Sequence, residues 1–245
     1  MKKILLLMAI ALPFVFISCD DNEPVVPDDH EWVDLGLPSG TLWATCNVGA
    51  NSPEEYGDYF AWGETTPKER YDGSNYKWAR WDWDTISGEI PQVNVTFNKY
   101  YFRDWDDNAY VEGDRKTELD PEDDAAYVNW GSQWRMPTLE QLLELEEYCD
   151  CQWTERNGIT GQLITGPNGK TIFFPAAGAR ADRTYYIGEN SYYWSRTLCS
   201  PEKYRIEVAD QEDAYILFLD PWYKEVWYST RYEGHSIRPA RASKK

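Results

Sequence analysis

The chain has 245 residues, a length that fits one domain or at most two. Its 24 basic and 42 acidic side chains give a formal net charge of −18. This charge disfavours nucleic acid and anionic lipid as partners, because both attract clustered basic residues. The chain also holds 13 tryptophans and 18 tyrosines, far more than disordered acidic tails carry, so the sequence predicts a folded domain with an aromatic-rich core.

The first eighteen residues have the organisation of a secretory signal peptide. Two lysines precede an apolar run over residues 4–17, which is shorter than the about 20 residues of a membrane span. Ser18 and Cys19 follow at the point where such a signal is cut. The segment Phe16–Cys19 resembles the bacterial lipobox, in which the cysteine becomes the lipidated first residue of the mature protein. We therefore expect a signal peptide over residues 1–18 and a lipid on Cys19; an ordinary secreted protein is the alternative.

Residues 19–30 are predicted to form a lipidated, acidic tether. Five acids and two prolines stand among residues 20–29 without a periodic apolar pattern. The acids directly after Cys19 resemble the surface-export signal in lipoproteins of some gut anaerobes, and this resemblance implies the outer face of the outer membrane. We expect a single domain over residues 31–245, held at the cell envelope through the lipid.

Short extended segments are predicted at the start of this domain. Residues 32–37 lead into the turn Pro38–Gly40, and residues 41–44 continue as a strand. Residues 59–62 form another short apolar run. Residues 67–115 are crowded with tryptophans, tyrosines and acids, and the sequence predicts a long, irregular, aromatic-rich loop there.

Two helices are predicted in the middle of the chain. The first begins with Asp120 as its N-cap, followed directly by a proline, and ends by Gly131. The second begins at Thr138, which forms a capping box with Gln141, and ends near Cys149. The leucines of this second helix lie on one broad apolar face, which predicts that it packs against a sheet.

The last third of the chain is predicted to be β-structure. Residues 161–164 and 171–174 flank a Pro-Asn-Gly turn at Pro167–Gly169, a strong signal for a hairpin. Two helices followed by strands that glycine and proline punctuate favour an α+β fold, with the helices packed on short antiparallel sheets. Further short strands are expected at 192–195, 214–219, 225–229 and 236–238.

Six segments carry the motifs of one protein family in the same order. They read VDLGLPSGTLWA, YGDYFAWGE, WRMPT, FPAAG, YWS and SIRP, and begin at residues 33, 56, 134, 174, 193 and 236. Over residues 32–241 the chain therefore resembles the FISUMP-type major paralogous domain of bacterial surface lipoproteins. The resemblance implies a C-type-lectin-like fold related to that of the formylglycine-generating enzymes. It implies no particular activity, because one fold hosts many functions.

The sequence offers little for a hydrolytic enzyme. Only two histidines are present, His30 in the tether and His235 before the last predicted strand. His235 could serve as the base of a serine or cysteine triad, but a turn or core role for it is the preferred interpretation. The chain has neither a G-x-S-x-G elbow nor an H-E-x-x-H helix. We therefore expect no enzymatic activity.

The remaining enzyme hypothesis is an oxidase of the formylglycine-generating type, which the resemblance raises. Those relatives bind copper through a pair of cysteines near the end of the domain. In this chain Cys149 and Cys151 stand instead at the end of the second helix, and Cys199 stands alone. The pattern does not match, so this activity is not the preferred alternative.

Cys46, Cys149, Cys151 and Cys199 are disulfide candidates, because export places them in an oxidising compartment. A bridge between Cys149 and Cys151 would close a very tight ring. A long-range bridge from Cys46 to one member of that pair is therefore preferred. No second paired-cysteine motif or nearby histidine completes a tetrahedral set, so no zinc site is predicted.

Acidic clusters raise the question of calcium. Asp104, Asp106 and Asp107 alternate with tryptophan and are weak calcium candidates, because calcium needs six to eight oxygen ligands. The acids of Asp120–Asp124 are explained better by helix capping. Calcium-dependent lectins carry a Trp-Asn-Asp motif where this chain has Trp194–Arg196, so we predict no resident cofactor.

The C-terminal region carries the predicted ligand-binding residues. Trp222 and Tyr223 stand in a turn between two predicted strands, and Arg231 and Tyr232 follow the second strand. We expect these four side chains to be exposed, because tryptophan and tyrosine offer large, rigid contact areas to partners. The sequence therefore predicts a non-enzymatic binding module for a glycan or protein ligand; a structural or adhesin-assembly component without a small ligand is the alternative.

Overall fold

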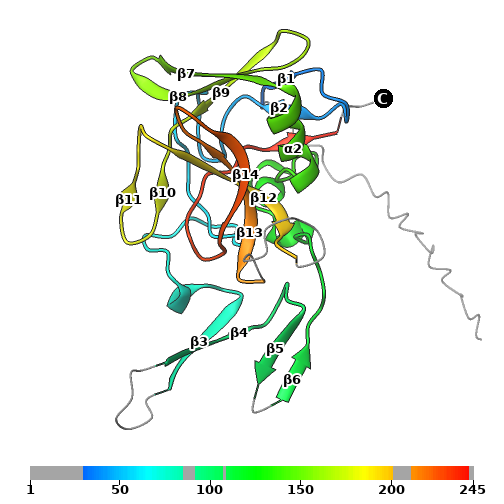
Figure 1. Cartoon of the computed structure of the whole chain (residues 1–245), viewed down its shortest axis with the longest axis vertical. Helices are drawn as coiled ribbons and strands as arrows, with labels where there is room; N and C mark the ends of the chain where they lie inside the picture. Colours follow the sequence, from blue (N-terminus) through cyan, green and yellow to red (C-terminus); the bar gives the residue numbers. More distant parts are fainter. Residues whose placement is uncertain (1–29, 85–91, 107–108, 201–210, 243–245) are drawn as a thin grey trace, which may run out of the picture.

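The computed structural model describes residues 30–84, 92–106, 109–200 and 211–242 (Figure 1). The described part of the chain has the predicted α+β class, with two α-helices and small sheets whose named strands all pair antiparallel. The predicted signal peptide and all of the tether except His30 lie outside the described residues. No helix in the described ranges is long and apolar enough to cross a membrane.

One small sheet joins the two ends of the domain. It contains β1 (Trp32–Asp34), β2 (Leu42–Ala44) and β15 (Ala240–Arg241), with β2 in the middle. Trp43 of β2 is paired with Val33 on one side and with Ala240 on the other. The extended segments predicted at the start of the domain are therefore confirmed, and β1 shares a sheet with the C-terminal strand β15, with β2 between them.

A three-stranded sheet forms the central layer of the molecule. It consists of β12 (Ser191–Leu198), β13 (Asp213–Leu219) and β14 (Lys224–Thr230), joined in sequence order. Alternate residues of β13 enter different core clusters, since Leu217 lies in one and Ile216 in the other. Successive side chains of a strand point to opposite faces, so the sheet separates two hydrophobic cores.

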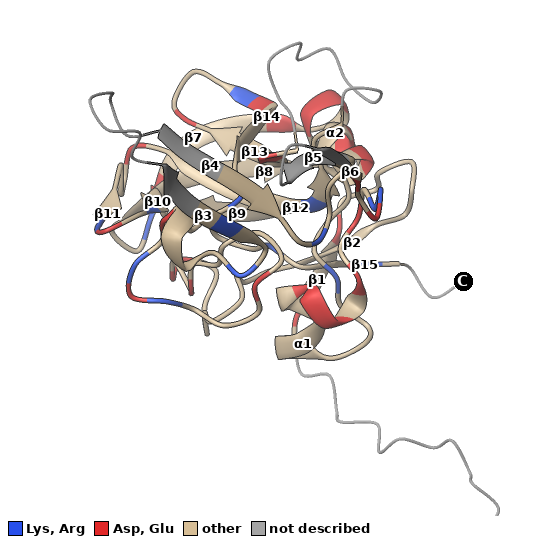
Figure 2. Cartoon of the chain, turned by 90° about the horizontal axis from the view of Figure 1, so that it is seen from below, with Lys and Arg blue, Asp and Glu red and all other residues tan. Residues whose placement is uncertain are grey.

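One of the two helices packs against all three strands of this sheet. The longer helix, α2 (Leu139–Tyr148), begins with the predicted capping box of Thr138 and Gln141. Its residues Leu142 and Leu145 are buried in the same core as Leu217. Four other side chains of α2 are acidic, and Figure 2 shows this acidic colouring on the helix.

The first helix is capped by a different residue from the one predicted. Pro121–Asp123 forms only a 3-10 turn, η2, and α1 (Ala125–Trp130) begins after Asp124. The carboxylate of Asp124 accepts the backbone N–H of Tyr127 and is fully buried. The carboxylate of Asp120 makes no capping bond and instead pairs with two lysines. Asp120 is the N-cap of the 3-10 turn η2, with Pro121 at its first position, and the prediction that it caps the α-helix was wrong.

A third three-stranded sheet contains the predicted hairpin. It consists of β7 (Asp150–Arg156), β8 (Ile159–Thr165) and β9 (Thr171–Pro175), and lies at the top of Figure 1. The turn between β8 and β9 places Gly169 at a φ of +80°, a conformation that glycine adopts readily. The small hairpin of β10 (Ala179–Arg180) and β11 (Thr184–Tyr185) precedes the central sheet in the chain.

The prediction of an irregular loop over residues 67–115 was wrong. This region holds one 3-10 turn, η1 (Gly73–Asn75), and two hairpins that extend from the bottom of the molecule in Figure 1. The hairpins pair their strands through regular antiparallel ladders. Their aromatic residues alternate with polar ones, which is the period of a strand rather than of a loop. The strands are β3 (Ala79–Asp84) with β4 (Gln92–Phe97) and β5 (Arg103–Asp106) with β6 (Ala109–Glu112).

Two further predicted strands are reduced to isolated bridges. Phe60 pairs with His235, and Ser236 pairs with Tyr193 in a parallel bridge. Through these bridges the segments 59–62 and 236–238 are held in the interior of the molecule, and Trp62 is fully buried there. The chain before β15 is thereby held against the central sheet.

Candidate functional site

The turn between β13 and β14 displays two aromatic rings on a fixed backbone. Trp222 is 81% exposed and Tyr223 is 59% exposed, as predicted. The Asp220 carboxylate accepts the backbone N–H groups of both residues, at 2.7 Å from Trp222 and 2.6 Å from Tyr223. Both side chains are therefore presented to solvent by a turn that Asp220 holds in one conformation.

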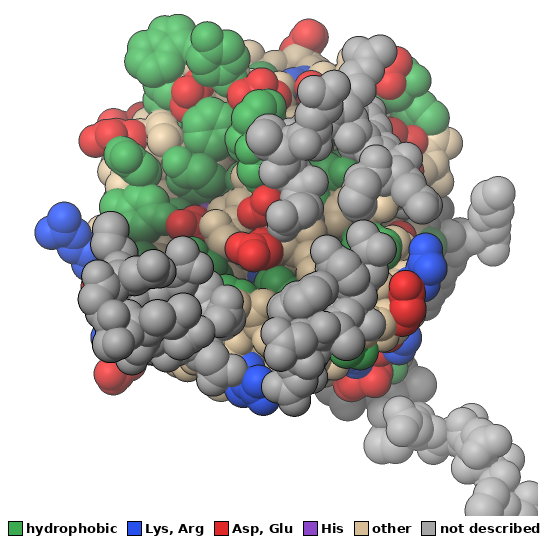
Figure 3. Space-filling model, turned by 60° about the horizontal axis from the view of Figure 1, so that its bottom comes forward, with side chains coloured by type: hydrophobic (Ala, Val, Ile, Leu, Met, Phe, Trp, Pro, Cys, Tyr) green, Lys and Arg blue, Asp and Glu red, His purple; other side chains and the backbone are tan. Residues whose placement is uncertain are grey.

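The end of the central sheet beside this turn continues the aromatic surface. The register places Tyr192 opposite Phe218, and Trp227 lies on the same side of the sheet. Trp227 is 47% exposed, whereas Tyr192 and Phe218 are half-buried. Figure 3 shows hydrophobic side chains gathered on one part of the surface, with acidic side chains among them. We define the aromatic face as Tyr186, Tyr192, Phe218, Trp222, Tyr223 and Trp227.

Acidic groups stand beside these rings. Burial raises the pKa of the Tyr192 hydroxyl, and nearby Tyr186, Glu233 and Asp220 raise it further. The Glu233 carboxylate accepts hydrogen bonds from Ser229 at 3.1 Å and from Tyr185 at 3.3 Å. The surface beside the aromatic face therefore offers fixed oxygen acceptors, which is a suitable arrangement for a ligand that carries hydroxyl or amide groups.

His235 lies beneath this surface and is a core residue. Its Nε2 atom is 2.8 Å from the Ser229 hydroxyl, which has already donated its only hydrogen to Glu233. Nε2 must therefore carry the hydrogen of the imidazole. His235 is fully buried and stacks on the ring of Tyr192. Burial lowers the pKa of His235 to about 3.

The same geometry does not form a catalytic triad. In a serine triad the carboxylate orients the histidine through the nitrogen that does not face the nucleophile. Here the Glu233 carboxylate is 3.7 Å from Nε2, on the serine side of the ring, and Nδ1 has no hydrogen-bond partner. Ser229 therefore has no oriented base, in agreement with the preferred core role of His235.

Arg231 is buried and Tyr232 is half-buried, so the prediction that both are exposed was wrong. The Arg231 guanidinium lies over the rings of Trp62 at 4.9 Å, Tyr76 at 5.4 Å and Phe97 at 4.7 Å from the ring centroids. Four of the five N–H groups of its guanidinium donate hydrogen bonds, one to a tyrosine hydroxyl and three to backbone carbonyls of neighbouring loops. The acceptors are the Tyr76 hydroxyl and the carbonyls of Lys99, Tyr100 and Gln211.

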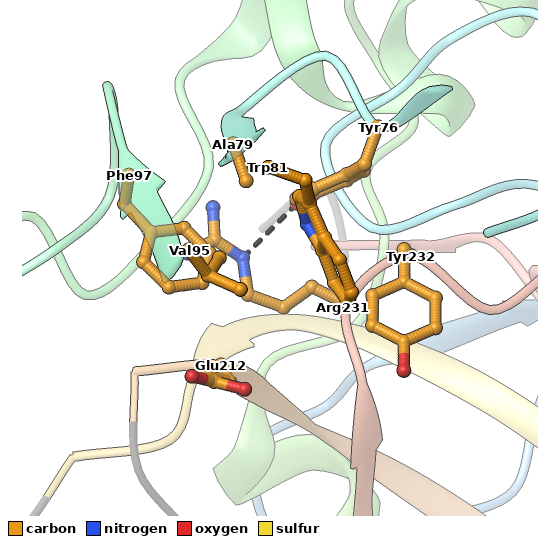
Figure 4. A pocket seen from close by; sticks show the side chains of 8 residues that line it. All are labelled: Tyr76, Ala79, Trp81, Val95, Phe97, Glu212, Arg231 and Tyr232. Carbon is orange, nitrogen blue, oxygen red and sulfur yellow. Dashed lines mark hydrogen bonds between the residues drawn. The ribbon is translucent and has the colours of Figure 1, made fainter. Parts of the chain in front are cut away.

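Tyr232 and Arg231 line a hollow between the β3–β4 hairpin and the end of β14 (Figure 4). The hollow is small, with room for about one water molecule, so it cannot enclose a drug-sized ligand. Trp81 and Tyr232 meet edge to face across it, with their ring centroids 5.5 Å apart. Its lining residues are Tyr76, Ala79, Trp81, Val95, Phe97, Glu212, Arg231 and Tyr232.

The sequence did not predict several residues of the aromatic face and of the hollow beside Tyr232. Trp81 and Val95 were assigned to an irregular loop, although polar residues alternate with them as they do in strands. Tyr192 and Phe218 are cross-strand neighbours, but they are 26 positions apart in the chain. Periodicity identifies their strands and gives no indication of which residues face each other.

All four cysteines of the described domain are free thiols, so the expected bridge from Cys46 is not formed. Cys149 and Cys151 belong to the core beneath α2. Cys46 lies next to Thr45, near the guanidinium of Arg238. Burial raises the pKa of Cys149 to about 11, which keeps this thiol protonated and disfavours it as a metal ligand.

The acidic cluster before α1 is already neutralised by lysines. Asp120, Glu122 and Asp123 bring carboxylate oxygens within 4.8 Å of one another. Lys99 lies 2.7 Å from Asp120 and 2.6 Å from Asp123, and Lys77 adds a second ammonium group at 3.2 Å from Asp123. A calcium ion would have to displace these ammonium groups. Of the other calcium candidates, Asp104 and Asp106 lie in β5 with side chains that are not described, and Asp107 lies outside the described residues.

Comparisons with family models, curated protein sequences and solved structures find no match to this chain.

Proposed function

We propose that the chain is an exported lipoprotein whose domain is a non-enzymatic binding module for a glycan or protein ligand. The observation that carries the proposal is the exposed pair of rings at Trp222 and Tyr223, which a fixed turn presents within the aromatic face. Large rings on a preorganised backbone bind partners with little loss of conformational entropy. The buried, neutral state of His235 also supports a function without acid–base catalysis.

The fold assigned in this proposal is C-type-lectin-like, of the FISUMP type. It is supported by the sequence motifs, several of which occupy structural positions in the domain. The motif VDLGLPSGTLWA contains β1 and β2, and the motif YWS lies in β12. The pairing of β15 with β2, which joins the two ends of the domain, is a further feature consistent with this assignment.

The proposed location is the cell envelope, with the domain attached through a lipid on Cys19 and directed to the outside. The support is the sequence of the first thirty residues alone. The acidic surface of the domain agrees with attachment through an inserted lipid rather than through charge, because anionic headgroups repel acidic surfaces.

Screening of the purified full chain on a glycan array and against envelope proteins tests the binding function. The double variant Trp222→Ala/Tyr223→Ala is the matched probe, because both side chains point into solvent and their loss leaves the core intact. A ligand that the wild type captures and the double variant does not capture supports the assignment. Equal capture by both proteins contradicts it.

A further inference from the structure

Three carboxylates beside the aromatic face have no basic partner, and we call them the acidic rim. They belong to Asp220, Glu225 and Glu233, and within the described residues none of them forms an ion pair with a lysine or an arginine. The Asp220 carboxylate accepts two backbone N–H groups of the turn. Glu233 accepts two neutral hydroxyls through a single oxygen, Oε2. The negative charges of the rim are therefore not compensated by these contacts.

The basic side chains nearest to the rim in the chain point away from it. Lys224 precedes Glu225, and its ammonium group donates to the carbonyls of Leu145 and Cys149 at the end of α2. Arg231 is fully buried, and its guanidinium donates to acceptors in the interior. Like charges gathered on one surface repel each other, so charge complementarity favours a cation as the ligand of this surface.

One row of side chains joins a pair of rings to a carboxylate of the rim. The register of the central sheet places Tyr192 opposite Phe218, and Phe218 opposite Glu225. Facing side chains of neighbouring strands lie about 4.5–5.5 Å apart at their Cβ atoms. The rings of Tyr192 and Phe218 contact each other, with their centroids 5.3 Å apart. Glu225 therefore stands at the edge of a surface already built from two rings.

Trp227 stands between two members of the rim along β14. Alternate residues of a strand point to the same side, so Glu225, Trp227 and Ser229 share one side. The Ser229 hydroxyl donates to Glu233, which brings a second carboxylate to this side. The indole of Trp227 stacks on the ring of Tyr228, with centroids 5.2 Å apart, while nearly half of Trp227 stays exposed. A cation placed over this fixed ring would lie between the two carboxylates.

We infer that the aromatic face and the acidic rim together bind an arginine side chain of a protein partner. A guanidinium stacks on aromatic rings and donates paired hydrogen bonds to carboxylates, so one side chain uses both parts of the surface. A lysine ammonium lacks this planar fork, and a neutral sugar leaves the charges of the rim uncompensated. The inference rests on the proposed function, and it narrows the ligand class to a basic segment of a protein.

Fluorescence anisotropy with a labelled peptide tests the inference on the full chain in a neutral detergent. The probe is a short peptide of alternating glycine and arginine, and the control probe carries citrulline, the neutral isostere of arginine, at the same positions. Physiological salt screens the general attraction between the acidic chain and a cationic peptide. We expect the arginine peptide to bind at least about tenfold more tightly, the effect of one charge-assisted hydrogen bond.

A pair of double variants locates the binding. Glu225→Gln/Glu233→Gln removes two charges from the rim and keeps oxygen acceptors at both positions. Its matched control, Glu122→Gln/Glu155→Gln, removes the same charge at exposed positions before α1 and in β7. The affinity for the arginine peptide should fall at least about tenfold in the rim variant and stay at the wild-type level in the control. Thermal unfolding confirms that each variant is folded.

The inference is overturned if the arginine peptide does not bind, or if it binds no better than the citrulline peptide. It is also overturned if the rim variant loses no more affinity than its matched control, because general charge attraction then explains the binding. The proposed function survives these results when Trp222→Ala/Tyr223→Ala still abolishes capture of a ligand found by screening. Such a ligand is then a glycan, or a protein segment that does not depend on arginine.

Discussion

The Arg231 guanidinium donates a hydrogen bond to the Tyr76 hydroxyl at 3.0 Å, and this bond joins the residue after β14 to the segment before β3. Tyr76 in turn donates to the carbonyl of Trp62 at 2.7 Å. The β3–β4 hairpin, the interior segment around Trp62 and the end of the central sheet therefore meet at one buried cation.

Replacing this cation should destabilise the whole domain. Arg231→Met keeps an apolar chain of similar length but leaves the Tyr76 hydroxyl and several carbonyls without their donor. We expect a loss of at least about 3 kcal/mol in the free energy of unfolding, because each buried acceptor left unpaired is costly. Urea unfolding followed by tryptophan fluorescence measures the loss. Arg115→Met at an exposed position is the control, with an expected change within about 0.5 kcal/mol. Equal stability of the two variants would show that the hydrogen bonds and ring contacts of Arg231 do not stabilise the fold.

Stability should fall with acid because of His235. Its pKa is lowered by burial to about 3 in the folded state, whereas an unfolded histidine titrates near 6.5. A depressed pKa means that the unfolded state binds the proton first, so stability is complete above pH 6.5 and is lost as the pH falls toward 3. The slope from one such group is about 1.4 kcal/mol per pH unit. Between pH 6.5 and 5, before most carboxylates titrate, His235→Asn should flatten the curve of unfolding free energy against pH. An unchanged slope in this variant would mean that His235 is protonated in the folded protein.

The capping carboxylate of α1 should be the sensitive acid in its cluster. The fully buried carboxylate of Asp124 accepts the N–H groups of Tyr127 and Met136 and pairs with Arg135 at 2.7 Å. We expect Asp124→Ala to lower the free energy of unfolding by about 3–5 kcal/mol, since a buried partner of a cation is removed. Glu122→Ala at an exposed position next to it should have a small effect. Chemical denaturation measures the free energy of unfolding of both variants. Equal losses in Asp124→Ala and Glu122→Ala would contradict the assignment of Asp124 as the cap of α1.

Membrane attachment should depend on one thiol. Cys19→Ser removes the nucleophile that accepts the lipid, because serine offers no equivalent thiolate. The variant should leave the membrane fraction or keep its signal peptide, while circular dichroism of the domain stays unchanged. Labelling with a fatty acid and fractionation of cells measure both steps. Uptake of labelled fatty acid by the Cys19→Ser protein would disprove the anchor.

Local signals in the sequence were sufficient for the elements that depend on neighbouring residues. The capping box of Thr138 and Gln141 and the Pro-Asn-Gly turn each act within four positions, and both are present as predicted. Asp120 and Asp124 have the same chemistry, so the choice between them depended on lysines elsewhere in the chain. Tertiary contacts decided the capping residue there.

The candidate site divides in the same way. The turn at Trp222 and Tyr223 is local, and its exposure was predictable from a proline-containing turn between strands. Arg231 follows only eight positions later, yet its burial depends on Tyr76 and on carbonyls more than a hundred residues away. A charged residue after a strand is usually solvated, and the aromatic cage that buries this one is assembled only in the folded chain.

The measurement that tests the central claim most directly compares two tryptophans of nearly equal exposure. Trp227 in the aromatic face is 47% exposed, and Trp32 in β1 is 46% exposed. With the ligand identified by screening, titration of the full-length wild type, Trp227→Ala and Trp32→Ala gives the dissociation constant of each. The account predicts that Trp227→Ala weakens binding at least about tenfold, as expected for an aromatic anchor, while Trp32→Ala binds like the wild type. Equal affinity of Trp227→Ala and the wild type, or a larger loss in Trp32→Ala, would contradict the claim that the aromatic face is the binding surface.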